Sequence, residues 1–473
     1  RPISFLFENS LFLIFGTVAA LIWANSDAID SYDHFVHFPL VGASSNDNHV
    51  SDNHVSDNHD SDNHDSDNHD SDNHGRHTAT SDDVDDQKKS AANDAQTSII
   101  SQIFTRVALR PDKNGHQHGI TVHFLVNDIL MAMFFAIAAG EVWEALLPGG
   151  SLSNPRKAAT PLLATLGGIL GPAGLYLLGS MLMGSTELYG DGWAIPCATD
   201  IAFSYLVARM IFGSSHPAIP FLLLLAIADD AIGLLILAIF YPSKPIEPVW
   251  FLLTLTAMLL CWLFRKNKIH SFWAYLLIPG ALCWLSFDLA GIHPALGLVP
   301  IIPCLPHAHT DLGIFAREEL NRKDTLNEMM HWWKNPVELI LGMFGLVNAG
   351  VAFGAIGQGT YLVLLGLLVG KPLGICFFTW LAKALFRLEM PAGMTARHVV
   401  VVGVISSIGF TVALFVSTAA FKDPNSPVLD SVKMGAVLSF FGAVLAFIVA
   451  RILRIRPLIE DEFPAATEAI GEA

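Results

Sequence analysis

Long apolar windows separated by short polar stretches make up most of this chain. A helix needs about 20 apolar residues to cross ~30 Å of hydrocarbon. Twelve windows approach this length, of which the eighth is short, at 10–25, 122–146, 158–180, 192–212, 218–240, 248–264, 272–291, 293–306, 335–355, 359–385, 397–420 and 432–452. The pattern predicts an all-α polytopic membrane protein with about 12 transmembrane helices.

The positions of Lys and Arg test this count and set the orientation. With the N-terminus inside, the inner loops and both tails hold 17 of them, whereas the short outer loops hold 3. An inner excess of this kind is the usual signature of cytoplasmic loops. We therefore expect both termini to be cytoplasmic. The long first outer loop holds 6 more of the 27 Lys and Arg residues and is too long to count in the orientation rule. The one that remains, Lys371, lies inside the tenth window.

Four parts follow from this pattern. They are an N-terminal tail with the first span (1–25), an exterior loop (26–121), a transporter core with spans 2–12 (122–455) and a C-terminal cytoplasmic tail (456–473). The loop holds 18 Asp against 6 Lys or Arg, so it carries most of the net charge of -16.

A five-residue repeat inside this loop places histidines at equal spacing: His49, His54, His59, His64, His69 and His74. It has almost no apolar side chains to offset the entropy of ordering, so we expect it to be largely disordered. It fits a cation-attracting or pH-buffering brush with weak capture of divalent metal. Neutral expansion of a tolerant exterior loop is the interpretation we favour.

The overall composition excludes an ordinary soluble enzyme, since 52% of the residues are apolar and only 15% are charged. The chain has five cysteines, an odd number without a CxxC pair, which argues against a disulfide framework or a metal cluster.

Charged residues inside the predicted spans carry the functional argument. The span LLLLAIADDAIGLLILAIF contains Asp229 and Asp230, the fourth span contains Asp200, and the tenth contains Lys371. Each acid at a bilayer centre costs roughly 2.5–3.5 kcal/mol on insertion scales, so such residues usually mark ion or proton routes. A static ion pair would need only two of the four.

The adjacency of Asp229 and Asp230 has a geometric meaning. Neighbouring residues on a helix point about 100° apart, so the two acids cannot face the same partner. One can face a cation and the other Lys371. A small cation that binds between two buried acids displaces their protons, because burial disfavours the charged forms that protons neutralise. This competition is the minimal chemistry of cation/proton exchange.

Two spans contain helix-breaking sequences. Pro196 and Thr199 precede Asp200 in the fourth span, and Ser406, Ser407 and Gly409 lie within the eleventh. Transporters built from inverted repeats place their ion sites where such broken helices meet.

Several segments together resemble the NhaA family of bacterial sodium/proton antiporters. They are WAIPCATDIAF, LAIADDAIGLLILAIFY, LLVGKPLGI and VVVGVISSIGFTVALFV, with VNDILMAMFFAIAAGEVWEAL and LVNAGV in the expected order. The resemblance covers nearly all the chain except 26–121 and the last dozen residues. It implies an inverted-repeat transporter fold in which two broken helices cross near the midplane.

The resemblance also implies a function. A family member would be a secondary active transporter of the bacterial inner membrane, not an enzyme, exporting Na+ or Li+ for pH and sodium homeostasis. Two protons would enter per sodium ion, which makes the exchange electrogenic. It would need no cofactor beyond the transported ions and would form a homodimer through exterior β-structure after the first span.

Roles for individual residues follow from the same resemblance. Asp230 would be the main cation ligand, and Asp229 would alternate between the cation and Lys371. Thr199 and Asp200 would lie at the break of the fourth span, where Asp200 helps to offset the charge of the half-helix dipoles.

The cytoplasmic entrance resembles the family less closely. The candidates for the ion funnel or the pH response are Asp128, Glu141, Glu144, Glu328 and His331. Glu144 is displaced from the expected position, which Ala145 occupies. For Glu141, Glu144, Glu328 and His331, an ordinary interfacial role fits equally well.

Three alternatives stay open. The transported cation could be K+ or Ca2+. An intramembrane aspartyl protease also uses two aspartates, but the GxGD segment that such proteases share is absent and they need no buried lysine. A channel or sensor with a transporter body would lack the proton counter-flow. Nothing in the sequence suggests a nucleic-acid partner.

Overall fold

The computed structural model describes residues 11–41, 110–111, 117–118, 120–148, 150, 152, 155–213, 215–306, 324–388, 390–391, 393–423 and 426–457. The predictions for the histidine repeat and for residues 458–473 of the C-terminal tail lie outside them. The chain divides into two units, one of Arg1–His37 with Val122–Ala473 and one of Phe38–Thr121.

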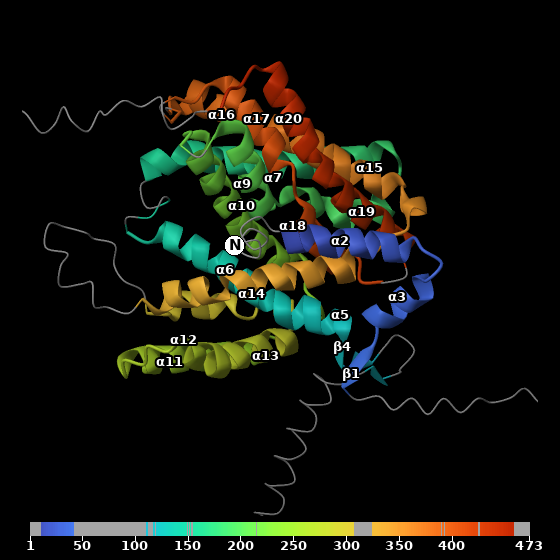
Figure 1. The fold of residues 1–473 in the computed structure, drawn as a ribbon. Coiled ribbons are helices and arrows are strands. Elements are labelled where there is room, and N and C mark those ends of the chain that lie inside the picture. Colours follow the sequence, from blue (N-terminus) through green and yellow to red (C-terminus); the bar gives the residue numbers. More distant parts are fainter. Residues whose placement is uncertain are drawn as a thin grey trace, which may run out of the picture. The chain divides into compact units, whose positions relative to one another are not determined.

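The larger unit is a bundle of helices (Figure 1). Three π-helical segments (η1, η4 and η9) continue directly into α-helices, and the other η segments are 3-10 turns. Its elements are α2 Leu11–Ala24, α3 Ile29–Val36, α5 Val122–Phe124, η1 Leu125–Leu130, α6 Met131–Leu146, α7 Pro155–Leu182, α8 Thr186–Tyr189, η2 Gly190–Cys197, α9 Ile201–Phe212, α10 Ala218–Phe240, η3 Pro248–Trp250, α11 Phe251–Lys266, α12 Phe272–Tyr275, η4 Leu276–Gly280, α13 Ala281–Ala290, η5 Pro294–Leu296, η6 Val299–Cys304, α14 Thr325–Asn348, η8 Phe353–Ala355, α15 Gln358–Leu364, η9 Leu365–Gly370, α16 Lys371–Phe386, α17 Ala396–Ser406, α18 Phe410–Ala420, α19 Pro427–Leu438, η10 Ser439–Phe441 and α20 Gly442–Ile452.

Membrane-spanning length is reached by most of the predicted windows. Among the described residues, seven helices are long and apolar enough to cross a bilayer, and up to nine if each of two bent pairs is one span. The windows at 10–25 and 293–306 contain shorter apolar helices, and α14 covers the ninth with several charged residues. A polytopic helical membrane protein is therefore what the structure supports, and the count of 12 stays a prediction.

The two predicted breaks are present. Thr186–Cys197 and Ile201–Phe212 are bent by 53°, and Ala396–Ser406 and Phe410–Ala420 by 49°. Pro196 is the penultimate residue of the first segment of the fourth span, and Gly409 lies directly before the second half of the eleventh. The interruptions therefore fall where the helix-breaking residues predict them.

Helices α7 and α16 cross at very close range because glycines line the contact. A Cβ atom on Gly374 would overlap the carbonyl oxygen of Gly167, and one on Gly171 would overlap that of Gly370. Small residues let helix backbones approach in this way in membranes. The crossing fixes the helix that begins with Lys371 against α7.

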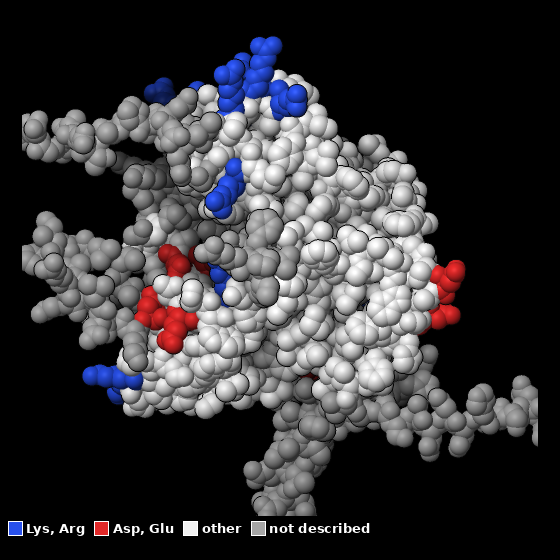
Figure 2. Space-filling model, in the orientation of Figure 1, with Lys and Arg blue, Asp and Glu red and all other residues white. Residues whose placement is uncertain are grey.

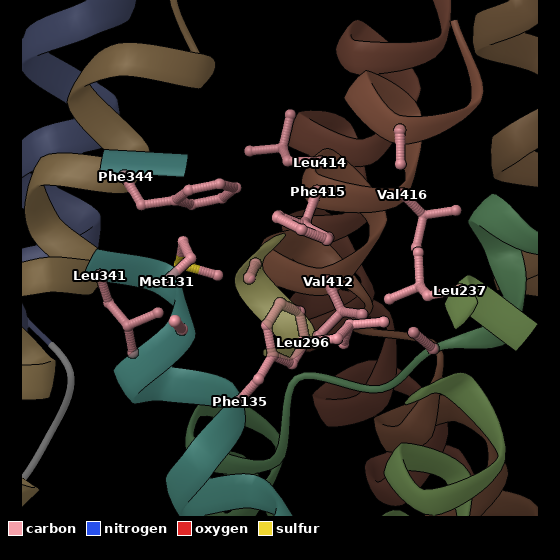
Figure 3. Close-up of a cluster of buried hydrophobic side chains, with 14 of the residues drawn as sticks. Met131, Phe135, Leu237, Leu296, Leu341, Phe344, Val412, Leu414, Phe415 and Val416 are labelled. Atoms are coloured by element: carbon pink, nitrogen blue, oxygen red, sulfur yellow. The ribbon is translucent and has the colours of Figure 1, made fainter. Parts of the chain in front are cut away.

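A cluster of apolar side chains packs the half-helix α18 against α6, α10 and α14 (Figure 3). Phe415 of α18 forms an edge-to-face pair with Phe135 of α6, with ring centroids 4.8 Å apart. Leu237 and Phe344 complete the contact from α10 and α14. The second half of the eleventh span is thus held by side-chain packing.

Helix α3 lies in the stretch that sequence reasoning assigns to the largely disordered exterior loop. Its Tyr32 is buried and donates a hydrogen bond to the carbonyl oxygens of Leu346 and Val347, at 2.9 and 3.0 Å. Gly350 leaves the room that the Tyr32 ring occupies. Contacts with distant residues, which local composition does not reveal, stabilise this helix.

The described residues of the smaller unit form four short strands. β1 (Pro39–Val41) pairs antiparallel with β4 (Ile120–Thr121), and β2 (Arg110–Pro111) pairs antiparallel with β3 (Gln117–His118). β-structure after the first span, expected from the family resemblance, is therefore present, and its exterior location stays a prediction.

Candidate functional site

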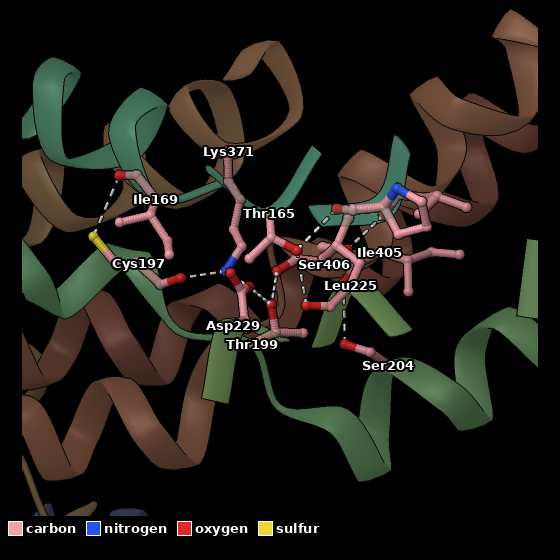
Figure 4. Close-up of polar contacts among 12 residues, drawn as sticks. Thr165, Ile169, Cys197, Thr199, Ser204, Leu225, Asp229, Lys371, Ile405 and Ser406 are labelled. Carbon is pink, nitrogen blue, oxygen red and sulfur yellow. Dashed lines mark hydrogen bonds and ion pairs between the residues drawn. The ribbon is translucent and has the colours of Figure 1, made fainter. Parts of the chain in front are cut away.

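A buried ion pair forms the centre of the site (Figure 4). Lys371 Nζ lies 2.8 Å from Asp229 Oδ2, and both side chains are fully excluded from solvent. Lys371 also donates to the carbonyl oxygen of Cys197 at 2.5 Å. That carbonyl ends η2, and the end of a helical segment carries a partial negative charge. The ammonium group therefore lies against the full charge of the Asp229 carboxylate and the partial charge of the Cys197 carbonyl.

The other oxygen of Asp229 is differently placed. Within the described part of the chain, Oδ1 is buried and has no hydrogen-bond partner. Asp229 lines two neighbouring cavities of about 20 and 10 Å³, and Asp230 lines the second. A cavity of this size accommodates about one water-sized group. Asp229 thus pairs with the lysine through one oxygen, its other oxygen has no partner among the described residues, and the residue borders space for a small ion.

Asp200 lies between the beginnings of two half-helices. Its Oδ1 accepts a hydrogen bond from the Phe203 amide at 3.1 Å and caps α9. Its Oδ2 accepts one from the Thr411 hydroxyl at 2.8 Å, in the first turn of α18. Helix beginnings carry a partial positive charge, so a carboxylate between two of them is favourably placed.

The two interruptions contact each other through backbone groups. The Asp200 amide donates to the Ile408 carbonyl at 2.8 Å, and the Ser204 hydroxyl donates to the Ile405 carbonyl at 3.2 Å. Thr199 Oγ1 lies 2.8 Å from Asp229 Oδ2 and 3.2 Å from the Ser406 carbonyl oxygen. Because a hydroxyl has one proton, Thr199 donates to only one of these acceptors at a time.

A series of acidic side chains lies between one surface of the larger unit and Asp230. Glu141 is close enough to Asp230 to act on it electrostatically, and Glu144 and Lys334 act in turn on Glu141. Figure 2 shows acidic side chains gathered on one face of the molecule, in the region where Figure 1 places the ends of α6 and α14. Asp324 belongs to this group through its effect on Glu144, and sequence reasoning missed it.

The structure does not bring the remaining candidates into the Asp229 cluster. Asp128 is buried in the π-helical turn η1, where its Oδ1 lies 3.8 Å from His293 Nδ1. Its carbonyl oxygen accepts a hydrogen bond from the Trp284 indole at 2.8 Å. Glu328 and His331 are exposed on the first turns of α14. These residues are separate from the ion pair.

The arrangement suits a small, hard cation. Oxygen atoms of Asp229, Asp230 and Thr199 are the type of ligand that such ions prefer, and Lys371 is a competing cation for the same carboxylate. A carboxylate that can pair with a lysine, a metal cation or a proton has the chemistry that exchange requires.

Comparison with known proteins adds an independent line of evidence. The family profile described as Na+/H+ antiporter 1 matches residues 91–453. A relative in Jannaschia sp. (strain CCS1), named Na(+)/H(+) antiporter NhaA, is 44% identical over 96% of this chain and 99% of its own length. Relatives of the same name are 48% identical in Geotalea uraniireducens (strain Rf4), over 73% of this chain and 89% of the relative, and 40% identical in Desulfitobacterium hafniense (strain DSM 10664 / DCB-2), over 98% of both.

Proposed function

The chain belongs to this family of Na+/H+ antiporters, and we propose that Asp229 and Asp230 carry the ions that it exchanges. The chain is a secondary active transporter, and the resemblance inferred from its motifs is confirmed. The roles of single residues, the stoichiometry and the orientation in the membrane are parts of the proposal.

The position of Asp229 Oδ1 carries the assignment of the site. It is a buried carboxylate oxygen without a hydrogen-bond partner among the described residues, and Asp229 and Asp230 line a common cavity. Sodium would bind between the two carboxylates, with Asp230 as the main ligand. When sodium leaves, a proton neutralises Asp230 and the Lys371 ammonium pairs with Asp229, because two adjacent anions within a span are costly without a cation.

Lys371 makes this competition reversible. While no sodium is bound, its ammonium group satisfies Asp229. A sodium ion that binds Asp229 displaces the lysine, whose remaining described acceptor is the Cys197 carbonyl. One proton leaves Asp230 and a second leaves Lys371, whose buried ammonium group has lost its carboxylate partner, as one sodium ion enters the site. Each cycle then moves one net positive charge, so the exchange is electrogenic.

Thr199 would act as an adjustable ligand. In the lysine-paired state its hydroxyl donates to Asp229, whereas rotation toward the Ser406 carbonyl turns an oxygen lone pair toward the cation. Replacing Thr199 by Val removes this oxygen, so we expect the KM for Na+ to rise about tenfold with a smaller change in kcat. Thr199→Ser keeps the hydroxyl and is the matched control. An unchanged KM in Thr199→Val, measured as Na+-dependent proton flux, would contradict the role.

The acidic group formed by Glu141, Glu144 and Asp324 would attract cations toward Asp230. Its negative charge is close to the ends of α6 and α14, which are cytoplasmic in the orientation expected from the Lys and Arg distribution. Asp128 with His293, and Glu328 with His331, would contribute to the funnel or the pH response from separate positions. A charged entrance raises the local concentration of the counter-ion.

The cellular setting follows from the same reasoning. We place the chain in the bacterial inner membrane as a homodimer with both termini in the cytoplasm, where it exports Na+ or Li+ and serves pH and sodium homeostasis. The apolar helices support a membrane location.

Proton flux in inverted vesicles tests the function directly. Na+ and Li+ should each release protons from acidified vesicles over a pH series, while K+ and Ca2+ should not. A membrane-potential dye in proteoliposomes should report net charge movement that reverses at the potential set by two protons per sodium. Sodium flux without a linked pH change would contradict antiport and indicate a channel. Flux with K+ or Ca2+ alone would reassign the cation.

A further inference from the structure

Two histidines from distant parts of the chain meet at the beginnings of two helices. His216 lies two residues before α10, next to the N-cap residue Pro217, and His398 is the third residue of α17. Their rings are nearly perpendicular, with centroids 4.6 Å apart. Phe212 of α9 contacts both rings, at 5.1 Å from His216 and 5.9 Å from His398. The three rings form one cluster that joins three helices.

Each imidazole also caps a helix. The Ala218 amide donates to His216 Nδ1 at 3.0 Å, in the first turn of α10. The Thr395 amide donates to His398 Nδ1 at 3.1 Å, and the Thr395 side chain accepts in return from the His398 amide. This is a capping box in which His replaces the usual Glu or Gln. Both caps need the Nδ1 lone pair, so both imidazoles must be neutral.

The surroundings disfavour a charged imidazole. Apolar side chains of α9, α10, α17 and α20 pack around the pair, and His216 is buried. Three of these helices carry an exposed arginine: Arg209 in the last turn of α9, Arg397 in the first turn of α17 and Arg451 in the last turn of α20. Burial and the neighbouring His398 hold the pKa of His216 below its usual value. A helix beginning adds a further positive partial charge.

The sign of the pH effect follows from this shift. Since the pKa of His216 is lower in the folded arrangement than in a free chain, the arrangement has its full stability above pH ~6.5. It loses stability as the pH falls below that value, because the opened state binds more protons. Protonation of either ring breaks one cap and places a cation against the other ring.

Both capped helices lead to the ion site. Helix α10 continues from Ala218 to Asp229, and α17 continues from Ala396 to Ser406, whose carbonyl oxygen lies 3.2 Å from Thr199 Oγ1. A contact that joins the beginnings of these two helices therefore restrains two of the elements that hold the sodium ligands.

We propose that His216 and His398 form a proton-operated latch, which holds the beginnings of α10 and α17 together when both are neutral and releases them when either is protonated. Release at acidic pH lowers the rate of exchange. The effect adds to the competition of protons for Asp229 and Asp230, which the latch does not alter.

The test uses a latch that cannot be protonated. In the double variant His216→Asn, His398→Gln, the side-chain amide oxygens can still accept the two cap hydrogen bonds at every pH, as in ordinary helix caps. At saturating Na+ we expect kcat at pH 5.5 relative to pH 8 to be about threefold higher than in the wild type, because the wild-type caps are lost below pH ~6.5. His270→Gln, which removes an exposed histidine between α11 and α12, is the control and should leave the ratio unchanged.

A second measurement does not depend on transport. In the full-length protein with 15N-labelled histidines, assigned with the single variants His216→Asn and His398→Gln, the His216 imidazole should titrate below pH ~6.5 and in a manner coupled to His398. The variant His398→Gln should raise the pKa of His216. Independent titration at the ordinary value, or a pH profile of the double variant that coincides with the wild type, would overturn the latch. The inference uses antiport only for its activity readout, so loss of exchange in the wild type would count against the proposed function and leave the titration as the test of the latch.

Discussion

Asp230→Asn should abolish Na+-driven proton flux, with a loss of about 100-fold or more, since the variant lacks both a charged ligand and a proton carrier. Asp229→Asn should abolish it as well, but with a second effect. It leaves Lys371 buried opposite a neutral amide, and breaking one partner of a buried pair costs about 3–5 kcal/mol. Thermal unfolding should therefore distinguish two variants that are equally inactive.

Asp288→Asn is the matched control for both variants. Asp288 is also a buried acid within a span, but its carboxylate lies 3.3 Å from Lys244 Nζ and does not line either cavity next to Asp229. It should retain exchange. A double variant Asp229→Asn, Asp230→Asn with full activity in inverted vesicles would remove the basis of the proposed site.

Gly374→Ala should displace the helix that carries Lys371 and reduce exchange to below about a tenth of the wild-type rate. The added Cβ would overlap the Gly167 carbonyl oxygen, which is backbone and cannot turn aside. Overpacking of tight contacts typically costs 1–3 kcal/mol, and we expect about 3 kcal/mol here because both helix backbones must move. Thermal unfolding in detergent and proton flux together measure the effect.

Gly174→Ala provides the same substitution without the overlap. Gly174 lies on α7, and a Cβ there would meet nothing within 4 Å. Replacing a glycine in a helix by alanine then stabilises by about 0.5–1 kcal/mol. Equal stability of the two variants would mean that the α7–α16 crossing does not position Lys371.

The central ion pair could be predicted because charges inside a membrane are rare enough to be counted. Once the other Lys and Arg residues had been assigned to loops and tails, Lys371 was the cation left for one of the two adjacent acids. The family resemblance implied Asp229 as its partner, and the two are in contact. The breaks could be predicted as well, because Pro196 and Gly409 interrupt helices through their own backbone properties.

Other parts of the site depend on backbone atoms or on tertiary packing, which no periodicity encodes. The carbonyl of Cys197 accepts from Lys371, yet any residue at that position has a carbonyl. Asp324 precedes α14 and reads as an ordinary helix cap, since its carboxylate accepts from the Asn327 amide. Its proximity to Glu144 follows from the packing of α14 beside α6. The contact of His216 with His398 joins residues 182 positions apart in the same way.

The hydrogen bonds between the two interruptions have a consequence for biosynthesis. The Asp200 amide and the Ser204 hydroxyl, made early, donate to the carbonyl oxygens of Ile408 and Ile405, which the ribosome adds about 200 residues later. Unpaired backbone groups are costly in lipid. The fourth span therefore cannot adopt its final bent form during insertion and must wait for the eleventh, so the ion site assembles in one late step. Two separately expressed halves, divided between α13 and α14, should regain exchange only when they are produced in the same cell.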